Sequence, residues 1–323
     1  MKRVLITRGV FDEVAAGLAK KFEVEHNAED RPWPPEELAR RLAGKHGAMA
    51  TVMDRFDEAV LARSPDLKVI SNIAVGYNNI DLAACTKRGI RVTNTPGVLD
   101  DTTADLTWAL LMAAARRIAE GDAYVRAGDW KIAFGVQYFL GQDIHHATLG
   151  IVGMGRIGQA IARRARGFDM KVLYHNRTRL AEAEERRLGV SYTDRERLLV
   201  ESDFVVVMAP YSPATHHLIG AAEIAKMKPT AILVNTARGG VVDDEALVYA
   251  LKHGRIAGAG LDVFEGEPSV NPGYLELRNV VMTPHIGSAS AATRMTMCRT
   301  AMRNLTDVLE GREPPNLVNP IPA

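Results

Sequence analysis

Three polar side chains in the last third of the sequence could together reduce a carbonyl group. Arg238, Glu267 and His285 each lie in a loop that is expected to follow a buried strand. Histidine donates a proton readily near neutral pH, and a neighbouring carboxylate favours its charged form and fixes its orientation. An arginine fork binds a carboxylate with two hydrogen bonds and polarises the carbonyl beside it. The three residue types therefore predict the reduction of a 2-keto acid to a 2-hydroxy acid.

A glycine-rich turn predicts the cofactor that such a reduction needs. Gly153, Gly155 and Gly158 form the pattern G-x-G-x-x-G between an apolar strand and a helical stretch. The first glycine permits a tight turn, the second lets the backbone approach a pyrophosphate, and the third lets the helix pack closely on the strand. The helix then presents its free N–H groups to the phosphates. We predict a dinucleotide site at this turn, with Arg156 and Ile157 as part of it.

The residues after the next expected strand, 171–175, indicate which dinucleotide binds. NAD-binding folds usually have Asp or Glu there to hold the ribose 2′-hydroxyl. This chain has Asn176, Arg177, Thr178 and Arg179 instead. Two guanidinium groups and two neutral hydrogen-bonding groups suit a 2′-phosphate, and no carboxylate repels it. We expect NADP(H) as the preferred cofactor. NAD(H) is the alternative if the two arginines only form a solvated loop.

Short apolar runs alternate with helical stretches, which is typical of parallel sheets covered on both faces. The first part of the chain is expected to contain strands at 3–7, 22–25, 48–52, 68–72 and 90–94. Strands of the second part are expected at 149–152, 171–175, 204–208, 231–235, 258–262 and 280–283, followed by a helix at 289–309. Ligands bind at the carboxyl edge of such a sheet. The loops at this edge supply the remaining candidates for cofactor contact, Pro210, Thr215, Thr236, Asp262 and Gly287.

Between the two parts, the sequence predicts one long helix from Asp101 to Glu120. Its body is apolar on nearly every side. A helix of this kind is buried in a core or in a subunit interface. Both interpretations stay open.

The composition is that of an ordinary globular protein. The 323 residues suggest two domains, and 47% of them are hydrophobic and 24% charged. A net charge of +1 gives no reason to expect nucleic acid or a membrane surface as a partner. The longest apolar run, 108–115, is too short to span a bilayer, and Arg8 interrupts the first apolar run, which argues against a secretory signal. We expect a cytoplasmic protein with no metal site, in which Cys85 and Cys298 are buried free thiols.

Taken together, the motifs resemble the D-isomer-specific 2-hydroxyacid dehydrogenases over essentially the whole chain. The resembling segments are 73–81, 91–97, 103–105, 153–158, 235–239, 260–265, 267–268 and 284–288. The resemblance implies that Arg238, Glu267 and His285 are catalytic. Glu265 is not implied, because the catalytic acid of the family directly precedes a proline. The resemblance also implies substrate contacts from Val75, Gly76, Arg238, His285 and Ser288.

The resemblance further implies an α/β architecture of two doubly wound parallel-sheet domains. A Rossmann nucleotide domain, 101–286, is inserted into a flavodoxin-like substrate domain made of 1–100 and 287–323. A homodimer through the nucleotide domains is implied as well. In related hydroxypyruvate reductases an aromatic residue of the 130–140 region reaches the partner's active site. Tyr138 is the candidate here, unless it only packs locally.

Within the family, the loop 176–178 and Ser288 are most similar to glyoxylate/hydroxypyruvate reductases and 2-ketogluconate reductases. We therefore expect NADPH-dependent reduction of hydroxypyruvate to D-glycerate and of glyoxylate to glycolate. One alternative is an NAD-dependent dehydrogenase of a bulkier acid, such as a phosphoglycerate or 2-ketogluconate. Another is a non-enzymatic dinucleotide sensor, which would leave the three filled catalytic positions without a purpose.

Overall fold

The computed structural model describes residues 1–319, and the chain divides into two compact units. The first unit contains Met1–Leu99 and the residues from Ala289 on, and the second contains Asp100–Ser288. The expected boundaries after residues 100 and 286 differ from these by one and two residues. The last four residues of the expected segment 287–323 lie outside the described part. Within residues 1–319, no helix has both the length and the apolar character needed to cross a membrane.

The first unit is built on a five-stranded parallel sheet with the strand order β2-β1-β3-β4-β5. This order is that of flavodoxin-like folds, as expected. Every strand ends within a few residues of its predicted position. The strands are β1 (Arg3–Ile6), β2 (Glu23–His26), β3 (Gly47–Ala50), β4 (Val69–Asn72) and β5 (Arg91–Thr93).

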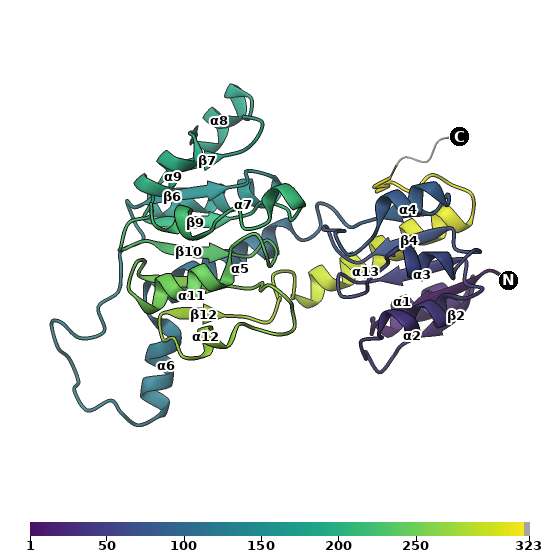
Figure 1. Cartoon of the computed structure of the whole chain (residues 1–323), viewed down its shortest axis with the longest axis horizontal. Coiled ribbons are helices and arrows are strands. Elements are labelled where there is room, and N and C mark those ends of the chain that lie inside the picture. Colours follow the sequence, from purple (N-terminus) through teal and green to yellow (C-terminus); the bar gives the residue numbers. More distant parts are fainter. Residues whose placement is uncertain (320–323) are drawn as a thin grey trace. The chain divides into compact units, whose positions relative to one another are not determined.

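Helices cover both faces of this sheet because its inner strands are apolar on both sides. Helices α1 (Asp12–Ala19) and α13 (Ala291–Leu309) pack on one face, and Figure 1 shows α13, in yellow, beside β4. The other face is covered by α2 (Pro35–Leu42), α3 (Glu58–Ala62) and α4 (Leu82–Lys87). Sequence analysis did not predict α4, although Asp81 caps it by accepting the N–H of Ala84.

The second unit is built on a seven-stranded parallel sheet with the strand order β12-β11-β10-β9-β6-β7-β8. Counted from β6, this is the Rossmann order with a further strand beside β11, which confirms the expected fold class. The short strand β8 was not expected. The strands are β6 (Thr148–Val152), β7 (Lys171–His175), β8 (Val190–Tyr192), β9 (Phe204–Val207), β10 (Ile232–Asn235), β11 (Gly258–Leu261) and β12 (Val280–Met282).

Alternate residues of these strands supply two separate cores. Phe204 and Val206 of β9 belong to one core, and Val205 and Val207 belong to the other. The first core is covered by α5 (Asp100–Ala115), α7 (Arg156–Ala165) and α8 (Glu182–Leu188). The second is covered by α9 (Arg195–Glu201), α10 (Ala221–Ile224), α11 (Asp244–Lys252) and α12 (Pro272–Leu275).

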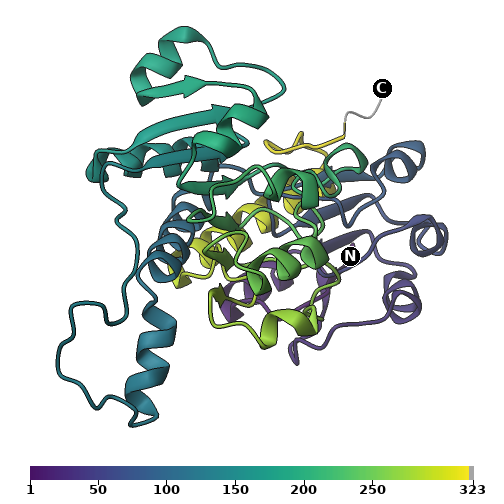
Figure 2. The same ribbon diagram turned by 60° about the vertical axis from the view of Figure 1, so that its left-hand side comes forward.

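The expected single helix 101–120 is wrong, because the chain forms two helices there. Helix α5 ends at Ala115, and α6 (Ile118–Arg126) begins after Arg117, whose φ of 53° is left-handed. The backbone N–H of Gln142 donates to the Ala115 carbonyl at 2.9 Å, so the chain after the loop supplies a hydrogen-bond donor for the last carbonyl of α5. Figures 1 and 2 show α6 and the loop after it projecting from the seven-stranded sheet. Residues 118–142 are called the arm below.

Both cysteines are buried and free, as predicted. Burial raises the pKa of the Cys85 thiol to about 12 and that of Cys298 to about 11. A thiol that keeps its proton is a poor nucleophile and a poor metal ligand. Both side chains therefore belong to the core of the first unit.

Candidate active site

Arg238, Glu267 and His285 all lie at the carboxyl edge of the seven-stranded sheet. Arg238 follows β10, Glu267 follows β11, and His285 follows β12. These three strands are direct neighbours and run parallel, so their following loops meet at one edge. The fold thus brings together three residues that are far apart in the sequence.

The His285 and Glu267 side chains form a hydrogen-bonded pair. Nδ1 of His285 lies 2.7 Å from Oε2 of Glu267, and Oε1 of Glu267 accepts the Phe264 N–H at 2.8 Å. Burial alone would raise the pKa of Glu267, but the hydrogen bond and charge of His285 outweigh it, so this pKa is lowered. With Nδ1 engaged, Nε2 of His285 contacts no hydrogen-bonding group of residues 1–319 and can serve a substrate.

A buried carboxylate fixes the turn that carries His285. The backbone N–H of His285, whose φ is 54°, donates to the Asp262 carbonyl at 2.9 Å. The Asp262 carboxylate accepts the Thr283 hydroxyl at 2.6 Å and the N–H groups of Ile286 and Gly287 at 2.7 and 2.8 Å. Burial raises the pKa of Asp262, although these three bonds lower it. Asp262 and Gly287 therefore position the histidine, and their contact with a cofactor stays a prediction.

Arg238 is a cation without a counter-ion. Its side chain is half-buried, Nη1 donates to the Ala237 carbonyl at 2.7 Å, and no carboxylate of the described residues forms an ion pair with it. Burial lowers the pKa of Arg238, while the charge of Glu267 raises it, and a guanidinium stays protonated in either case. The loop also needs Gly239, since a Cβ there would lie 1.8 Å from the Phe264 carbonyl oxygen. The site can thus bind an anion beside a proton donor.

Glu265 belongs to a different pair. Its Oε2 lies 3.0 Å from Nε2 of His217, although it is only two residues from Glu267. The carboxylate before the proline is therefore the one that contacts His285, as the sequence pattern implied.

The three glycines of the G-x-G-x-x-G turn differ in their surroundings. Gly153 has a φ of 109°, and a Cβ there would lie 2.6 Å from the backbone of Met208. A Cβ at Gly158 would lie 2.4 Å from the Gly153 oxygen. A Cβ at Gly155, at the N-terminus of α7, would meet no atom of the described chain within 4 Å. The open space before α7, which begins with Arg156 and Ile157, thus fits a pyrophosphate.

Replacing Gly155 with valine should weaken NADPH binding more than about tenfold, because the new side chain would occupy the space that the phosphates need. The dissociation constant is measured by titrating the quenching of tryptophan fluorescence. Gly167→Val is the matched control, because Gly167 also has open space beyond its Cβ and no left-handed φ. Equal effects of the two variants, or unchanged binding by Gly155→Val, would contradict the phosphate site.

The two arginines expected to bind a 2′-phosphate differ in the structure. Arg179 forms two hydrogen bonds with Glu185, at 2.8 and 2.7 Å, and lies over the Tyr192 ring. The Arg179 guanidinium, with the Tyr174 hydroxyl, lowers the pKa of Glu185 to about 2. Arg177 is exposed and has no ion pair or hydrogen bond to any residue of the described chain. Only Arg177 is thus free without a cofactor, and the contact of either arginine with a 2′-phosphate stays a prediction.

Most of the other loop residues expected to contact a cofactor form hydrogen bonds within or between the loops. The Asn176 Oδ1 accepts the N–H of Met154 at 2.7 Å and so ties the second loop to the glycine turn. The Thr215 hydroxyl donates to the Pro210 carbonyl at 2.7 Å, and the buried Thr236 hydroxyl lies 2.7 Å from that of Thr107. Thr178 is exposed. All of these residues lie at the carboxyl edge, and their cofactor contacts stay predictions.

In the first unit, Val75 and Gly76 follow β4 and present unpaired N–H groups. The Val75 carbonyl accepts from Asn94 at 2.9 Å and the Gly76 carbonyl accepts from Asn72 at 2.8 Å. Neither backbone N–H donates to a group of residues 1–319. These two donors can bind an anion. Ser288, the last residue of the second unit, is half-buried.

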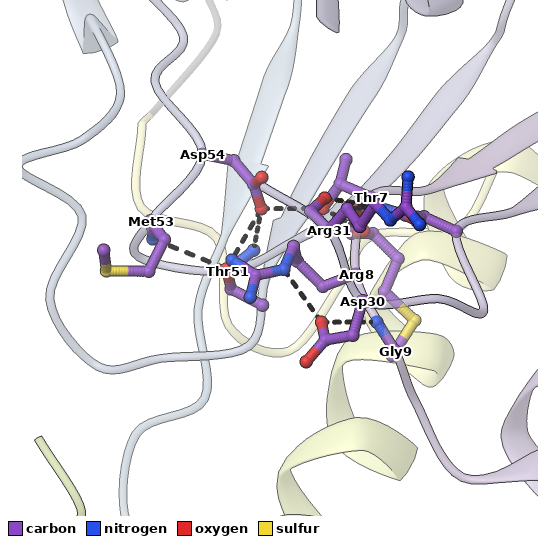
Figure 3. A network of polar contacts seen from close by, with 10 residues as sticks. Thr7, Arg8, Gly9, Asp30, Arg31, Thr51, Met53 and Asp54 are labelled. Atoms are coloured by element: carbon purple, nitrogen blue, oxygen red, sulfur yellow. Dashed lines mark hydrogen bonds and ion pairs between the residues drawn. The ribbon is translucent and has the colours of Figure 1, made fainter. Parts of the chain in front are cut away.

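A buried carboxylate that sequence analysis missed lies at the same edge of the first sheet. Asp54 accepts the Thr7 hydroxyl at 2.7 Å and the Thr51 N–H and hydroxyl at 2.8 and 3.0 Å (Figure 3). The network fixes the turn after β3 and leaves the Met53 side chain exposed. The spacing Thr-x-x-Asp is the signal that could have revealed it, because such side chains hydrogen-bond nearby backbone groups.

The fold, the glycine turn and the three converging side chains define a dinucleotide-binding oxidoreductase. The model of the D-isomer specific 2-hydroxyacid dehydrogenase, NAD binding domain, matches residues 108–287. The chain belongs to the D-isomer-specific 2-hydroxyacid dehydrogenase family.

Relatives with named activities resemble nearly the whole chain. Glyoxylate reductase of Thermococcus gammatolerans is 49% identical over 98% of this chain and 96% of the relative. Glyoxylate reductase of Pyrococcus furiosus is 48% identical over 98% and 95%. The solved structure of the NADPH-dependent glyoxylate/hydroxypyruvate reductase of Sinorhizobium meliloti with NADP and malonate has a TM-score of 0.88. It is 32% identical and covers 98% of this chain and 96% of its own.

Proposed function

We propose that this chain reduces glyoxylate to glycolate and hydroxypyruvate to D-glycerate with NADPH. The observation that carries the proposal is the 2.7 Å pair of His285 and Glu267, with the unpaired Arg238 on the adjacent strand's loop. The phosphate-binding turn lies at the same edge of the same sheet. The relatives named glyoxylate reductase support the choice of substrate.

Arg238 binds the substrate carboxylate. Its guanidinium fork donates two hydrogen bonds to the carboxylate and draws electron density from the neighbouring carbonyl. Partial burial strengthens this attraction, because little water screens the charge. The N–H groups of Val75 and Gly76 are our proposed anion-binding groups of the first unit, and Ser288 is a further proposed substrate contact.

His285 supplies the proton. When bound, the nicotinamide supplies the hydride for the carbonyl carbon. Nε2 of His285 then donates its proton to the carbonyl oxygen, which completes the alcohol. Glu267 holds Nδ1 and keeps the ring oriented before transfer. Because the pKa of Glu267 is lowered, this carboxylate stays ionised at neutral pH.

The proposed preference for NADPH rests on the free side chain of Arg177. Its guanidinium would bind the 2′-phosphate, with Asn176 and Thr178 beside it. The pyrophosphate would lie before Gly155 at the N-terminus of α7. NADP in the solved structure of the Sinorhizobium meliloti relative supports this assignment.

The experiment that tests the proposal follows the nicotinamide absorbance with glyoxylate, hydroxypyruvate and 2-ketogluconate, each with NADPH and with NADH. We expect fast oxidation of NADPH with glyoxylate or hydroxypyruvate. Turnover with NADH alone would contradict the role of Arg177. Turnover of 2-ketogluconate alone would overturn the proposed substrate, and no turnover at all would overturn the reductase.

We also propose that the chain forms a homodimer through the arm. Trp130, Phe134 and Val136 on the arm are 55%, 84% and 82% exposed, which is unusual for large apolar side chains. Tyr138 instead packs against Tyr124 and Phe139, and its hydroxyl is buried. Tyr138 therefore packs within the arm, and its contact with a partner subunit stays a prediction. We add Phe134 as the more exposed candidate for that contact.

Replacing both Phe134 and Val136 with serine should raise the dimer dissociation constant more than about 100-fold, because four apolar side chains leave the interface. Sedimentation velocity over a concentration series measures it. Leu275→Ser is the control, because this side chain is 70% exposed but lies on α12. A wild-type chain that sediments as a monomer, or a double variant that stays dimeric, would contradict the interface.

A further inference from the structure

We propose that His216, His217 and Glu265 form a binding site for a divalent transition-metal ion, foremost Zn²⁺, on the second unit. One ring nitrogen of each histidine and one oxygen of Glu265 lie within 4.8 Å of one another. Two imidazoles and a carboxylate are a donor set that zinc takes in proteins, with water at the fourth position. Sequence analysis expected no metal site. Glu265 lies 48 residues after His217 in the sequence. The fold removes that separation.

The backbone holds the two histidine rings in place. His217 has a left-handed φ of 51°, and its N–H donates to the Gly240 carbonyl at 2.8 Å. The rings of His216 and His217 are stacked, with centroids 3.8 Å apart. The Nε2 of His217 already lies 3.0 Å from the Glu265 carboxylate. The three donor side chains thus already lie beside one another.

The other ring nitrogens lie near polar groups of the kind that orient metal-binding histidines. Nδ1 of His217 lies 3.6 Å from the Asp243 carboxylate, and Nδ1 of His216 lies 3.5 Å from the Tyr211 hydroxyl. Such partners orient the ring and increase its basicity toward a metal. The arrangement leaves Nε2 of each histidine as the ligating atom. His216 and Glu265 are exposed, so an ion can enter from the solvent.

The site joins loops that also carry the proposed catalytic side chains. Glu265 precedes Glu267 by two residues, and Gly240, which accepts from His217, follows Arg238 by two residues. A bound ion would therefore tie the loop of His216 and His217 to the loop of Glu265, and the His217 N–H already ties the first of these to the loop after β10. We assign it a structural role, which does not depend on the substrate or on turnover.

Equilibrium dialysis of the chain without an affinity tag against ZnCl₂ tests the site. We expect one Zn²⁺ per chain, binding that is weakened more than about tenfold by His216→Gln and by Glu265→Gln, and no displacement by Mg²⁺, which prefers oxygen ligands. His145→Gln is the matched control, because His145 also lies beside a neighbouring histidine ring, here edge to face, and its Nε2 lies 3.8 Å from the Asp143 carboxylate.

Thermal unfolding gives a second readout, since an ion that binds only the folded chain raises its melting temperature. Zinc should stabilise the wild type and His145→Gln, but not His216→Gln. The proposal is overturned if less than one Zn²⁺ binds per chain, or if both ligand variants bind as the wild type does. Loss of binding by His145→Gln alone would also overturn it.

Discussion

Replacing His285 should reduce the turnover number with glyoxylate by about 10²–10⁴-fold, because the proposed proton donor is lost. The dissociation constant of NADPH should change little, because His285 lies in the loop after β12 and not in the glycine turn. Both alanine and asparagine variants should be made. Alanine removes the ring, while asparagine tolerates the left-handed φ of 54° at this position and preserves the turn. Steady-state kinetics at saturating NADPH give the turnover number.

A strained or unfolded loop would mimic loss of the donor, so the two variants are compared. Equal losses with intact NADPH binding support general acid catalysis by His285. A large loss for alanine with near-normal turnover for asparagine would mean that the backbone conformation matters and the imidazole does not. Unchanged turnover in both variants would remove His285 from the mechanism.

Glu267→Gln separates the orienting carboxylate from the donor. The amide keeps the shape of the side chain but loses the negative charge beside His285. Turnover with glyoxylate should fall, but less than in the His285 variants, because the amide oxygen can still accept from Nδ1 and hold the ring. Wild-type turnover in Glu267→Gln would make this residue merely structural. Glu245→Gln, an exposed change on α11, controls for the general loss of a negative charge.

Sequence reasoning located this site because the fold is regular where the site lies. Neighbouring parallel strands have the loops that follow them at one edge of the sheet. Recognising the strands before Arg238, Glu267 and His285 was therefore sufficient to predict that these residues lie close together. Which glutamate pairs with which histidine could not be predicted from the residues alone. The distinction between Glu265 and Glu267 came from the resemblance, and the structure shows its physical basis in two different histidine partners.

The misassigned elements depended on distant parts of the chain. Ile118 and Ala119 resume the apolar pattern after two arginines, so the end of α5 at Ala115 is not apparent from the sequence. The N–H that satisfies the Ala115 carbonyl comes from Gln142, 27 residues later. Two arginines two positions apart in the sequence look equivalent after β7. Their difference arises because Glu185, on α8, folds back onto Arg179 and leaves Arg177 in solvent. Local patterns cannot predict such tertiary partners.

Arg177→Asp should lower the ratio of kcat/KM for NADPH to that for NADH by more than about 100-fold. Two effects act in the same direction. The variant loses charge-assisted hydrogen bonds to the 2′-phosphate, and its carboxylate repels that phosphate. A carboxylate at the end of the second strand also accepts the ribose 2′-hydroxyl of NADH, as in NAD-binding folds. Initial rates over a range of each dinucleotide, at saturating glyoxylate, give both values of kcat/KM.

Arg179→Gln is the matched control, because it removes a guanidinium from the same loop. Since Glu185 already holds Arg179 with two hydrogen bonds, its loss should lower the melting temperature and leave the cofactor ratio within about threefold of the wild type. A ratio that changes equally in both variants would mean that Arg179 leaves Glu185 when the cofactor binds. A ratio that changes in neither would mean that the 2′-phosphate is recognised elsewhere, and the assignment of NADPH to Arg177 would be wrong.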